Sequence, residues 1–185
     1  MSRAGLGGLE AWVGENLSLP QERVTYGTAG QMAHEQFAPL SVLLVYPVPD
    51  RPRRAPGIPD EEFLRGEAPM TKEEVRTLAV SKLRLQNHHT VWDVGAGTGS
   101  VCVEMALAAR WGRVYAVERQ PEACGLIRQN RERFGAWNLT VVPGRAPEAL
   151  AELPAPDAVF VGGSGGELAD ILTAAMERNP AARIC

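Results

Sequence analysis

The sequence predicts an α/β fold in which helices cover both faces of a parallel sheet. From residue 71 onward, short apolar runs alternate with longer stretches of helical periodicity, and repeated strand–helix alternation is the pattern of such a sheet. The first apolar run leads into DVGAGTG, residues 93–99, directly before a helical pattern. A glycine-rich turn between a strand and a helix is typical of the nucleotide-binding members of this fold class.

The strands of this part are expected at four short apolar runs and at the end of the chain. Short apolar runs bounded by turn residues are typical of buried strands. The four runs are residues 91–94, 114–117, 139–142 and 158–161. Residues 182–185 have the pattern of a fifth strand that is only beginning, so we expect the sheet to be incomplete at this end.

The first helix of this part is expected to begin at Thr71, because Glu74 stands three residues on and the two can form a capping box. Its expected apolar face is Val75, Leu78, Ala79 and Leu83. The helix after the glycines is expected to place Val101, Met105 and Ala108 on one face.

Two further helices complete the pattern. Pro121 favours a helix start and Gly135 favours a helix end, so a helix is expected between them. The last helix is expected at residues 167–178.

Five prolines between residues 47 and 60 predict a boundary, because proline removes amide donors and interrupts helices and inner strands. We therefore expect a first domain at residues 1–49, a linker at 50–60 and a second domain at 61–185. Strands are expected near 9–13 and, as a buried run, at 41–48, with a short helix at 31–37 between them. So short a segment can hardly bury a core by itself, which indicates the tail of a larger domain.

The composition excludes several functional classes. The formal net charge is −3, and neither domain has the basic excess of a nucleic-acid-binding protein. No run of about 18 apolar residues indicates a membrane span. Cys102, Cys124 and Cys185 show no paired spacing, which favours reduced thiols in a cytoplasmic protein and no metal site.

The stretch around the glycines favours S-adenosylmethionine over a dinucleotide. Its pattern is D-x-G-x-G-x-G, whereas a dinucleotide site usually has G-x-G-x-x-G. Asp93 would repel a pyrophosphate, but it can accept a hydrogen bond from the ammonium group of an amino acid. Glu118 ends the next strand, where its carboxylate can accept hydrogen bonds from both ribose hydroxyls. The expected fold is therefore that of a Rossmann-like class I S-adenosylmethionine-dependent methyltransferase.

The group that receives the methyl is expected beside the fourth strand. That strand is followed by GGSGG, residues 162–166, where many amino-group methyltransferases carry an Asn- or Asp-Pro-Pro-aromatic motif. The small residues leave room for an acceptor, and their backbone amides can bind a carboxylate. A plain flexible turn is the alternative interpretation of this run.

Four motifs together resemble one family. GIPDEEFLRGEAPMTKEEVR, DVGAGTG, GRAPEAL and VFVGGSGGEL, within residues 57–185, are similar to the CbiT-type decarboxylating precorrin methyltransferases of cobalamin synthesis. Residues 10–49 resemble the tail of a CbiE-type tetrapyrrole methylase. The whole chain therefore resembles a fragment of the bifunctional enzyme in which the two domains are joined.

The resemblance implies a precorrin as the substrate, methylation of carbon 15 with loss of the ring C acetate carboxyl by the second domain, and methylation of carbon 5 by the first. It also implies self-association. Taken with the motifs, it gives an expected set of cofactor contacts: Thr71, Asp93, Gly95, Ala96, Gly97, Thr98, Gly99, Glu118, Arg145, Ala146 and Gly162.

A bound polycarboxylate needs donors for its carboxylates. The candidates for this role are Lys72, Arg76, Gly163, Ser164 and Gly165, with Arg119 and Arg145 as further cations. Two alternatives stay open: an NAD-dependent oxidoreductase, which the glycine spacing and Asp93 disfavour, and a non-catalytic fragment.

Overall fold

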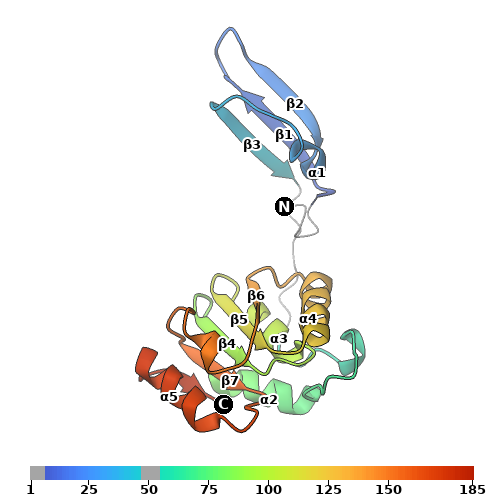
Figure 1. Cartoon of the computed structure of the whole chain (residues 1–185). Coiled ribbons are helices and arrows are strands. Elements are labelled where there is room, and N and C mark those ends of the chain that lie inside the picture. Colours follow the sequence, from blue (N-terminus) through green and yellow to red (C-terminus); the bar gives the residue numbers. More distant parts are fainter. Residues whose placement is uncertain (1–6, 47–54) are drawn as a thin grey trace. The chain divides into compact units, whose positions relative to one another are not determined.

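A computed structural model describes residues 7–46 and 55–185 of the chain, which forms two compact units, Met1–Pro52 and Arg53–Cys185 (Figure 1). Residues 50–54 of the expected linker, five of its eleven positions, lie outside the described residues. Within the described ranges, none of the helices has the length and hydrophobicity needed to cross a bilayer.

The first unit contains a three-stranded antiparallel sheet. The strands are β1 (Glu10–Glu15), β2 (Arg23–Thr28) and β3 (Ser41–Tyr46), in the order β2-β1-β3. The short helix α1 (Ala29–Met32) contributes Ala29 and Met32 to a small core with Ala11 and Val13.

Three expectations for this unit are wrong in detail. The sequence did not predict β2, which is half polar. The helix expected at 31–37 is α1, which begins earlier because Thr28 forms a capping box with Gln31. The strand expected to be buried is exposed at Val42 and Leu44, since the core of this unit lies on the other face of the sheet.

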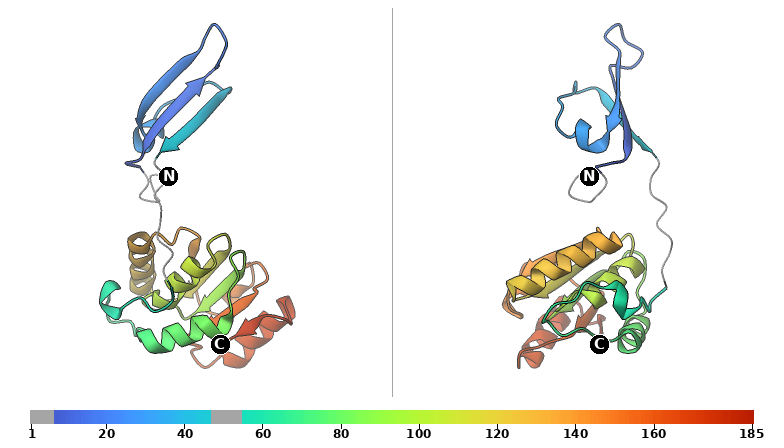
Figure 2. Two further views of the ribbon diagram at one scale, coloured as in Figure 1. Left: turned by 180° about the vertical axis from the view of Figure 1, so that it is seen from behind. Right: turned by 90° about the vertical axis from the view of Figure 1, so that its right-hand side faces the viewer.

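The second unit is built on a five-stranded parallel sheet (Figures 1 and 2). Its strand order is β6-β5-β4-β7-β8. The strands are β4 (Thr90–Val94), β5 (Arg113–Glu118), β6 (Leu139–Pro143), β7 (Ala158–Val161) and β8 (Arg183–Ile184). All five lie at the runs that the sequence predicts.

Helices cover both faces of this sheet, as predicted. Alternate residues of β4 point to opposite faces, so Val91 packs in one core cluster whereas Trp92 and Val94 pack in the other. The first cluster includes side chains of α2 (Glu73–Leu83), α3 (Ser100–Ala108) and α4 (Pro121–Phe134). The second includes side chains of the 3-10 helix η3 (Glu148–Leu150) and of α5 (Leu168–Arg178).

The sequence predicts α4 better than α2. As expected, α4 begins at Pro121 and is closed by Gly135 in the left-handed conformation, with φ 62°. By contrast, Thr71 does not cap α2: the N-cap residue is Lys72, and its side chain makes no capping hydrogen bond. The expected apolar face is half right: Ala79 and Leu83 are buried, but Val75 and Leu78 are each 59% exposed.

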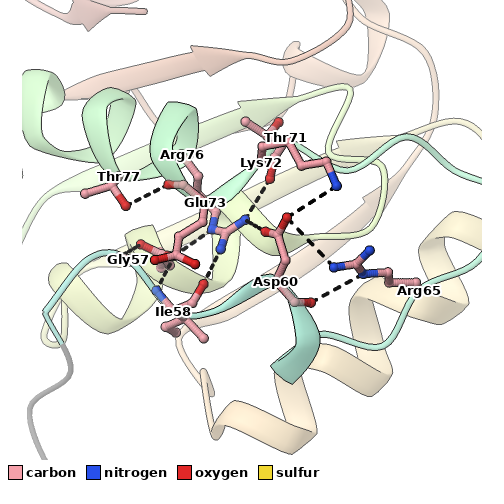
Figure 3. Close-up of polar contacts among 10 residues, drawn as sticks. Gly57, Ile58, Asp60, Arg65, Thr71, Lys72, Glu73, Arg76 and Thr77 are labelled. Carbon is pink, nitrogen blue, oxygen red and sulfur yellow. Dashed lines mark hydrogen bonds and ion pairs between the residues drawn. The ribbon is translucent and has the colours of Figure 1, made fainter.

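The inner face of α2 instead carries a buried arginine. Arg76 is 0% exposed and donates to Glu104 of α3 through Nε at 2.6 Å. It also donates to the Asp60 carboxylate at 3.0 Å and to the carbonyl oxygens of Thr71, at 2.7 Å, and Ile58 (Figure 3). The guanidinium of Arg76 therefore makes four hydrogen bonds inside the protein.

These contacts hold the segment that precedes α2, residues 57–72, which we call the strap. Glu104 accepts hydrogen bonds from the backbone amides of Gly57, at 2.9 Å, and Ile58, at 3.1 Å. The 3-10 helix η2 (Asp60–Glu62) lies within the strap, and Phe63 packs on Phe134 of α4 with ring centroids 4.6 Å apart. One buried ion pair, Arg76 with Glu104, thus anchors both ends of the strap.

Removing one partner of this pair should destabilise the second unit strongly. Arg76→Met leaves the Glu104 carboxylate buried without its counter-ion, so we expect a loss of about 3–5 kcal/mol in the free energy of unfolding. Urea denaturation followed by circular dichroism measures the loss. Arg133→Met, at an exposed position of α4, is the matched control. A loss below about 1 kcal/mol would show that the pair does not anchor the strap.

Candidate cofactor site at the carboxyl edge of the sheet

A cavity of about 600 Å³ opens at the carboxyl ends of the central strands of the second unit. This is the edge at which open α/β sheets bind ligands, and the volume lies in the usual range for small-molecule sites. Five segments form its wall: the strap at Glu67–Thr71, the loop after β4, the end of β5, the turn after β6 and the glycine run after β7.

The loop after β4 approaches its neighbours so closely that two of its glycines have no room for a side chain. A Cβ atom on Gly97 would lie 2.9 Å from the carbonyl oxygen of Pro69 in the strap. A Cβ atom on Gly95 would lie 2.4 Å from the carbonyl oxygen of Gly163. Both glycines also have positive φ, 55° and 72°, which disfavours other residues. The loop therefore touches both the strap and the glycine run.

Glu118 ends β5 and is fixed by backbone amides. Its Oε2 accepts a hydrogen bond from the Gly97 amide at 3.0 Å, and its Oε1 accepts one from the Gln120 amide at 2.9 Å. The side chain is 9% exposed and lines the cavity. Each carboxylate oxygen has a second acceptor direction, so the group is held in place and can still accept hydrogen bonds from a ligand.

Asp93 is the most unusual group of the site. It is 1% exposed, lines the cavity, and neither of its oxygens has a hydrogen-bond partner within the described residues. Burial raises the pKa of Asp93 to about 7, and the nearby Cys102 offsets only part of this effect. A buried carboxylate without a partner is costly for folding, which points to a cationic ligand as its partner.

Most of the predicted cofactor contacts come together at the cavity. Besides Asp93 and Glu118, the lining residues include Thr71, Gly95, Ala96, Gly97, Arg145, Ala146 and Gly162. Thr98 and Gly99 are not among them. Thr98 is buried, and Gly99 precedes α3 and packs against Ile127 of α4. Thr98 and Gly99 therefore belong to the glycine loop after β4 but do not line the cavity.

Only two of the four cations that the sequence analysis names as candidates for substrate binding line the cavity. The expectation that Arg76 binds a substrate carboxylate is wrong, because this side chain is buried and bound to the strap and to Glu104. Lys72 is exposed, pairs with Asp60 at 3.5 Å and does not line the cavity. Arg119 lines it and is exposed. Arg145 also lines it but is held by two hydrogen bonds to Glu167.

The glycine run after β7 forms the remaining wall. Gly163, Ser164 and Gly165, which the sequence analysis names as candidates for binding the acceptor, all line the cavity. The amides of Gly162 and Gly163 donate to the carbonyl oxygen of Val94, at 2.9 and 3.2 Å. In the part of the chain that the structure describes, the amides of the next three residues donate to no backbone carbonyl. These amides are therefore available to donate hydrogen bonds to a ligand.

Two residues that the sequence analysis did not identify, Glu104 and Asn130, bind the segments of the site without lining the cavity. Asn130 of α4 is 0% exposed and donates to the Thr98 carbonyl oxygen. Glu104 and Asn130 are polar residues within helices, where polar side chains usually face solvent, so only the contacts of the folded chain identify them. The one signal for Asn130 in the sequence is its position, three residues after the apolar Ile127.

Comparisons with known proteins match this second unit. The model of the precorrin methyltransferase domain matches residues 62–185. The chain is 55% identical over 130 residues to a probable cobalt-precorrin-6B C(15)-methyltransferase (decarboxylating) of Pyrobaculum calidifontis, covering 69% of this chain and 67% of the relative. It is 51% identical over 118 residues to the Salmonella typhimurium protein named cobalt-precorrin-6B C(15)-methyltransferase (decarboxylating), covering 63% of this chain and 60% of that relative.

Solved structures agree. The chain matches the precorrin-6y C5,15-methyltransferase of Geobacter metallireducens with a TM-score of 0.64 and 46% identity, covering 68% of this chain and 67% of the other. It matches the precorrin 8w decarboxylase of Methanobacterium thermoautotrophicum with a TM-score of 0.65 and 42% identity, covering 69% of each chain. The match to a putative O-methyltransferase of Klebsiella pneumoniae, at 20% identity and a TM-score of 0.53, shows the shared fold.

The chain thus spans 60 to 67% of the length of the two curated relatives described above. The matching family model, the identities near one half and the fold of the second unit lead to one conclusion: this chain belongs to the precorrin methyltransferase domain family.

Proposed function

We propose that the second unit binds S-adenosylmethionine and transfers its methyl group to carbon 15 of a precorrin, with loss of the ring C acetate carboxyl. The observation that carries the proposal is the pair of carboxylates on either side of the glycine loop. Neither oxygen of Asp93 has a hydrogen-bond partner among the described residues, and the carboxylate of Glu118 is held by two amides and can still accept further hydrogen bonds. S-adenosylmethionine carries an ammonium group, which would pair with Asp93, and a ribose diol, which would donate hydrogen bonds to Glu118.

The residues present fit this cofactor. The buried Asp93 suits an ammonium group, Glu118 suits two ribose hydroxyls, and the glycine loop lets a ligand approach the backbone. When bound, the cofactor supplies an electrophilic methyl on a sulfonium. A dinucleotide fits less well, because the unpaired carboxylate of Asp93 would repel a pyrophosphate at the start of α3.

The chain's own residues would mainly orient the reactants and exclude water, since a reduced tetrapyrrole has electron-rich bridging carbons and needs no strong base for attack. The glycine run would bind acceptor carboxylates through its free amides, with the exposed Arg119 as the cation at the cavity. Release of carbon dioxide leaves electrons that the conjugated ring can accept.

For the whole protein we propose a precorrin-6Y C(5,15)-methyltransferase (decarboxylating), in which the first unit belongs to a tetrapyrrole methylase domain that methylates carbon 5.

The reaction proposed for the second unit is tested with this chain in two stages. Calorimetric titration should show binding of S-adenosylhomocysteine and none of NADH; the reverse would make the protein an oxidoreductase. Mass spectrometry should then show one added methyl and one lost carboxyl on a precorrin. Cofactor binding without turnover would identify a non-catalytic fragment.

Glu118→Ala should weaken S-adenosylhomocysteine binding by about 1–3 kcal/mol, because hydrogen bonds between a charged group and the ribose are lost. Titration calorimetry measures the change. Glu122→Ala, at an exposed carboxylate in the first turn of α4, is the matched control. Equal affinities of the wild type and a folded Glu118→Ala variant would remove Glu118 from the site.

The affinity for S-adenosylhomocysteine should rise between pH 5.5 and 8. The pKa of Asp93 in the free protein is raised to about 7, so its negative charge, which the ligand ammonium needs, forms in this range. Titrations across the range measure the trend, and Asp93→Asn should flatten it. A wild-type affinity independent of pH would contradict the role of Asp93.

Asp93 should also lower the stability of the ligand-free protein as the pH rises. Its folded pKa, about 7, lies above the ordinary value of 3.8, so between these values the folded state holds a proton that the unfolded state releases, and stability falls. Asp93→Asn should therefore raise the melting temperature more at pH 8 than at pH 5. An equal effect at both pH values would contradict the raised pKa.

Gly165→Leu should obstruct the acceptor more than the cofactor. Gly165 has φ 60°, lines the cavity and has open space around its Cβ direction, so a leucine strains the turn and adds bulk beside the cavity. We expect methylation and decarboxylation to fall together while S-adenosylhomocysteine affinity changes less than threefold, about 0.7 kcal/mol. Gly165→Ala separates backbone strain from bulk. Loss of cofactor affinity with retained acceptor binding would place the acceptor elsewhere.

A further inference from the structure

Asn130 is a buried amide that joins two segments, the strap and the glycine loop, whose neighbouring residues line the cavity. Its Oδ1 accepts a hydrogen bond from the Leu64 amide at 2.8 Å, and its Nδ2 donates to the Leu64 carbonyl oxygen at 3.0 Å. The same Nδ2 donates to the Thr98 carbonyl oxygen at 2.9 Å. Leu64 belongs to the strap, whereas Thr98 belongs to the glycine loop, so one side chain binds both.

The two segments also meet directly at the cavity. The Pro69 carbonyl oxygen of the strap lies so close to Gly97 that a Cβ atom there would be only 2.9 Å away. Both residues line the cavity, but Asn130 does not. A small shift of the strap relative to the loop would therefore open or close the cavity at Gly97, and Asn130 opposes such a shift because it binds both segments.

The three backbone groups that Asn130 binds explain why an amide side chain stands at this position. One of them is an N–H donor and two are carbonyl acceptors, and an asparagine offers one oxygen acceptor and two N–H donors. A carboxylate would meet the two carbonyl oxygens with like partial charge, and an apolar side chain would leave all three buried groups unpaired. Among side chains of this size, an amide satisfies all three groups together.

We infer that Asn130 is a positioning residue, which sets the distance between the strap and the glycine loop and thereby the affinity for the cofactor without touching it. This inference rests on the proposed cofactor. It goes beyond that proposal because it assigns the shape of the site to a residue of α4 behind the loop.

The chain offers a matched control for this inference. Asn138, just before β6, also donates through Nδ2 to two carbonyl oxygens, those of Ala106 at 3.0 Å and Ala109 at 2.8 Å. These acceptors belong to the end of α3, and none of the three residues lines the cavity. Asn138→Asp therefore removes the same kind of hydrogen bonds as Asn130→Asp at a place away from the strap and the glycine loop.

The test compares S-adenosylhomocysteine affinity at a temperature at which both variants are more than 99% folded. Asn130→Asp should weaken binding tenfold or more, and Asn138→Asp less than twofold, even though both lower the melting temperature. In the ligand-free protein, amide hydrogen exchange should speed up in peptides covering residues 62–70 and 95–99 for Asn130→Asp alone. If Asn130→Asp does not fold, Asn130→Ser takes its place, because it adds no charge and leaves space for a water molecule.

The outcomes separate the inference from the proposed cofactor. If the wild type does not bind S-adenosylhomocysteine, the proposed function fails, and the exchange measurement alone judges whether Asn130 holds the two segments together. If the wild type binds and a folded Asn130 variant binds equally well, the inference is overturned. Equal losses of affinity in the Asn130 and Asn138 variants would also overturn it, because they would indicate a general effect of lost stability.

Discussion

The buried ion pair between Arg76 and Glu104 is the interaction on which the site depends. Arg76 belongs to α2 and Glu104 to α3, and neither side chain is accessible to solvent beyond a few per cent. Such a pair gains little net stability over a well-packed apolar core, but it is costly to break. Here its remaining hydrogen-bonding groups bind the backbone of the strap, so the pair determines where the strap lies.

The strap matters because it supplies one wall of the cavity. Residues 67–71 face the glycine loop, and the carbonyl oxygen of Pro69 comes within reach of Gly97. The glycine loop in turn contacts Gly163 of the run after β7. Three segments that are distant in sequence therefore form one chain of backbone contacts around the cavity, and the two carboxylates of the site lie along it.

The sequence predicts the parts of this architecture that depend on local pattern. Apolar runs locate all five strands of the second unit, and the spacing of the glycines and of Glu118 locates the cavity. Prediction failed where a tertiary contact overrides the pattern. Arg76 looks like a surface cation suited to a substrate, yet Glu104, 28 positions later, draws it into the core. Val75 and Leu78 look like core residues, yet the inward turn of Arg76 leaves them exposed. β3 of the first unit has an apolar sequence, but only one face of its sheet packs against a core, so Val42 and Leu44 on the other face are exposed.

We propose that S-adenosylmethionine lies between the strap and the glycine loop, with its ammonium group on Asp93 and its ribose hydroxyls on Glu118. The most direct measurement is a crystal structure of the chain with S-adenosylhomocysteine. The account predicts the ligand ammonium within hydrogen-bond reach of Asp93, directly or through one water, and both ribose hydroxyls on Glu118. A ligand bound outside the cavity, or one that leaves Asp93 without a cationic partner, would contradict it.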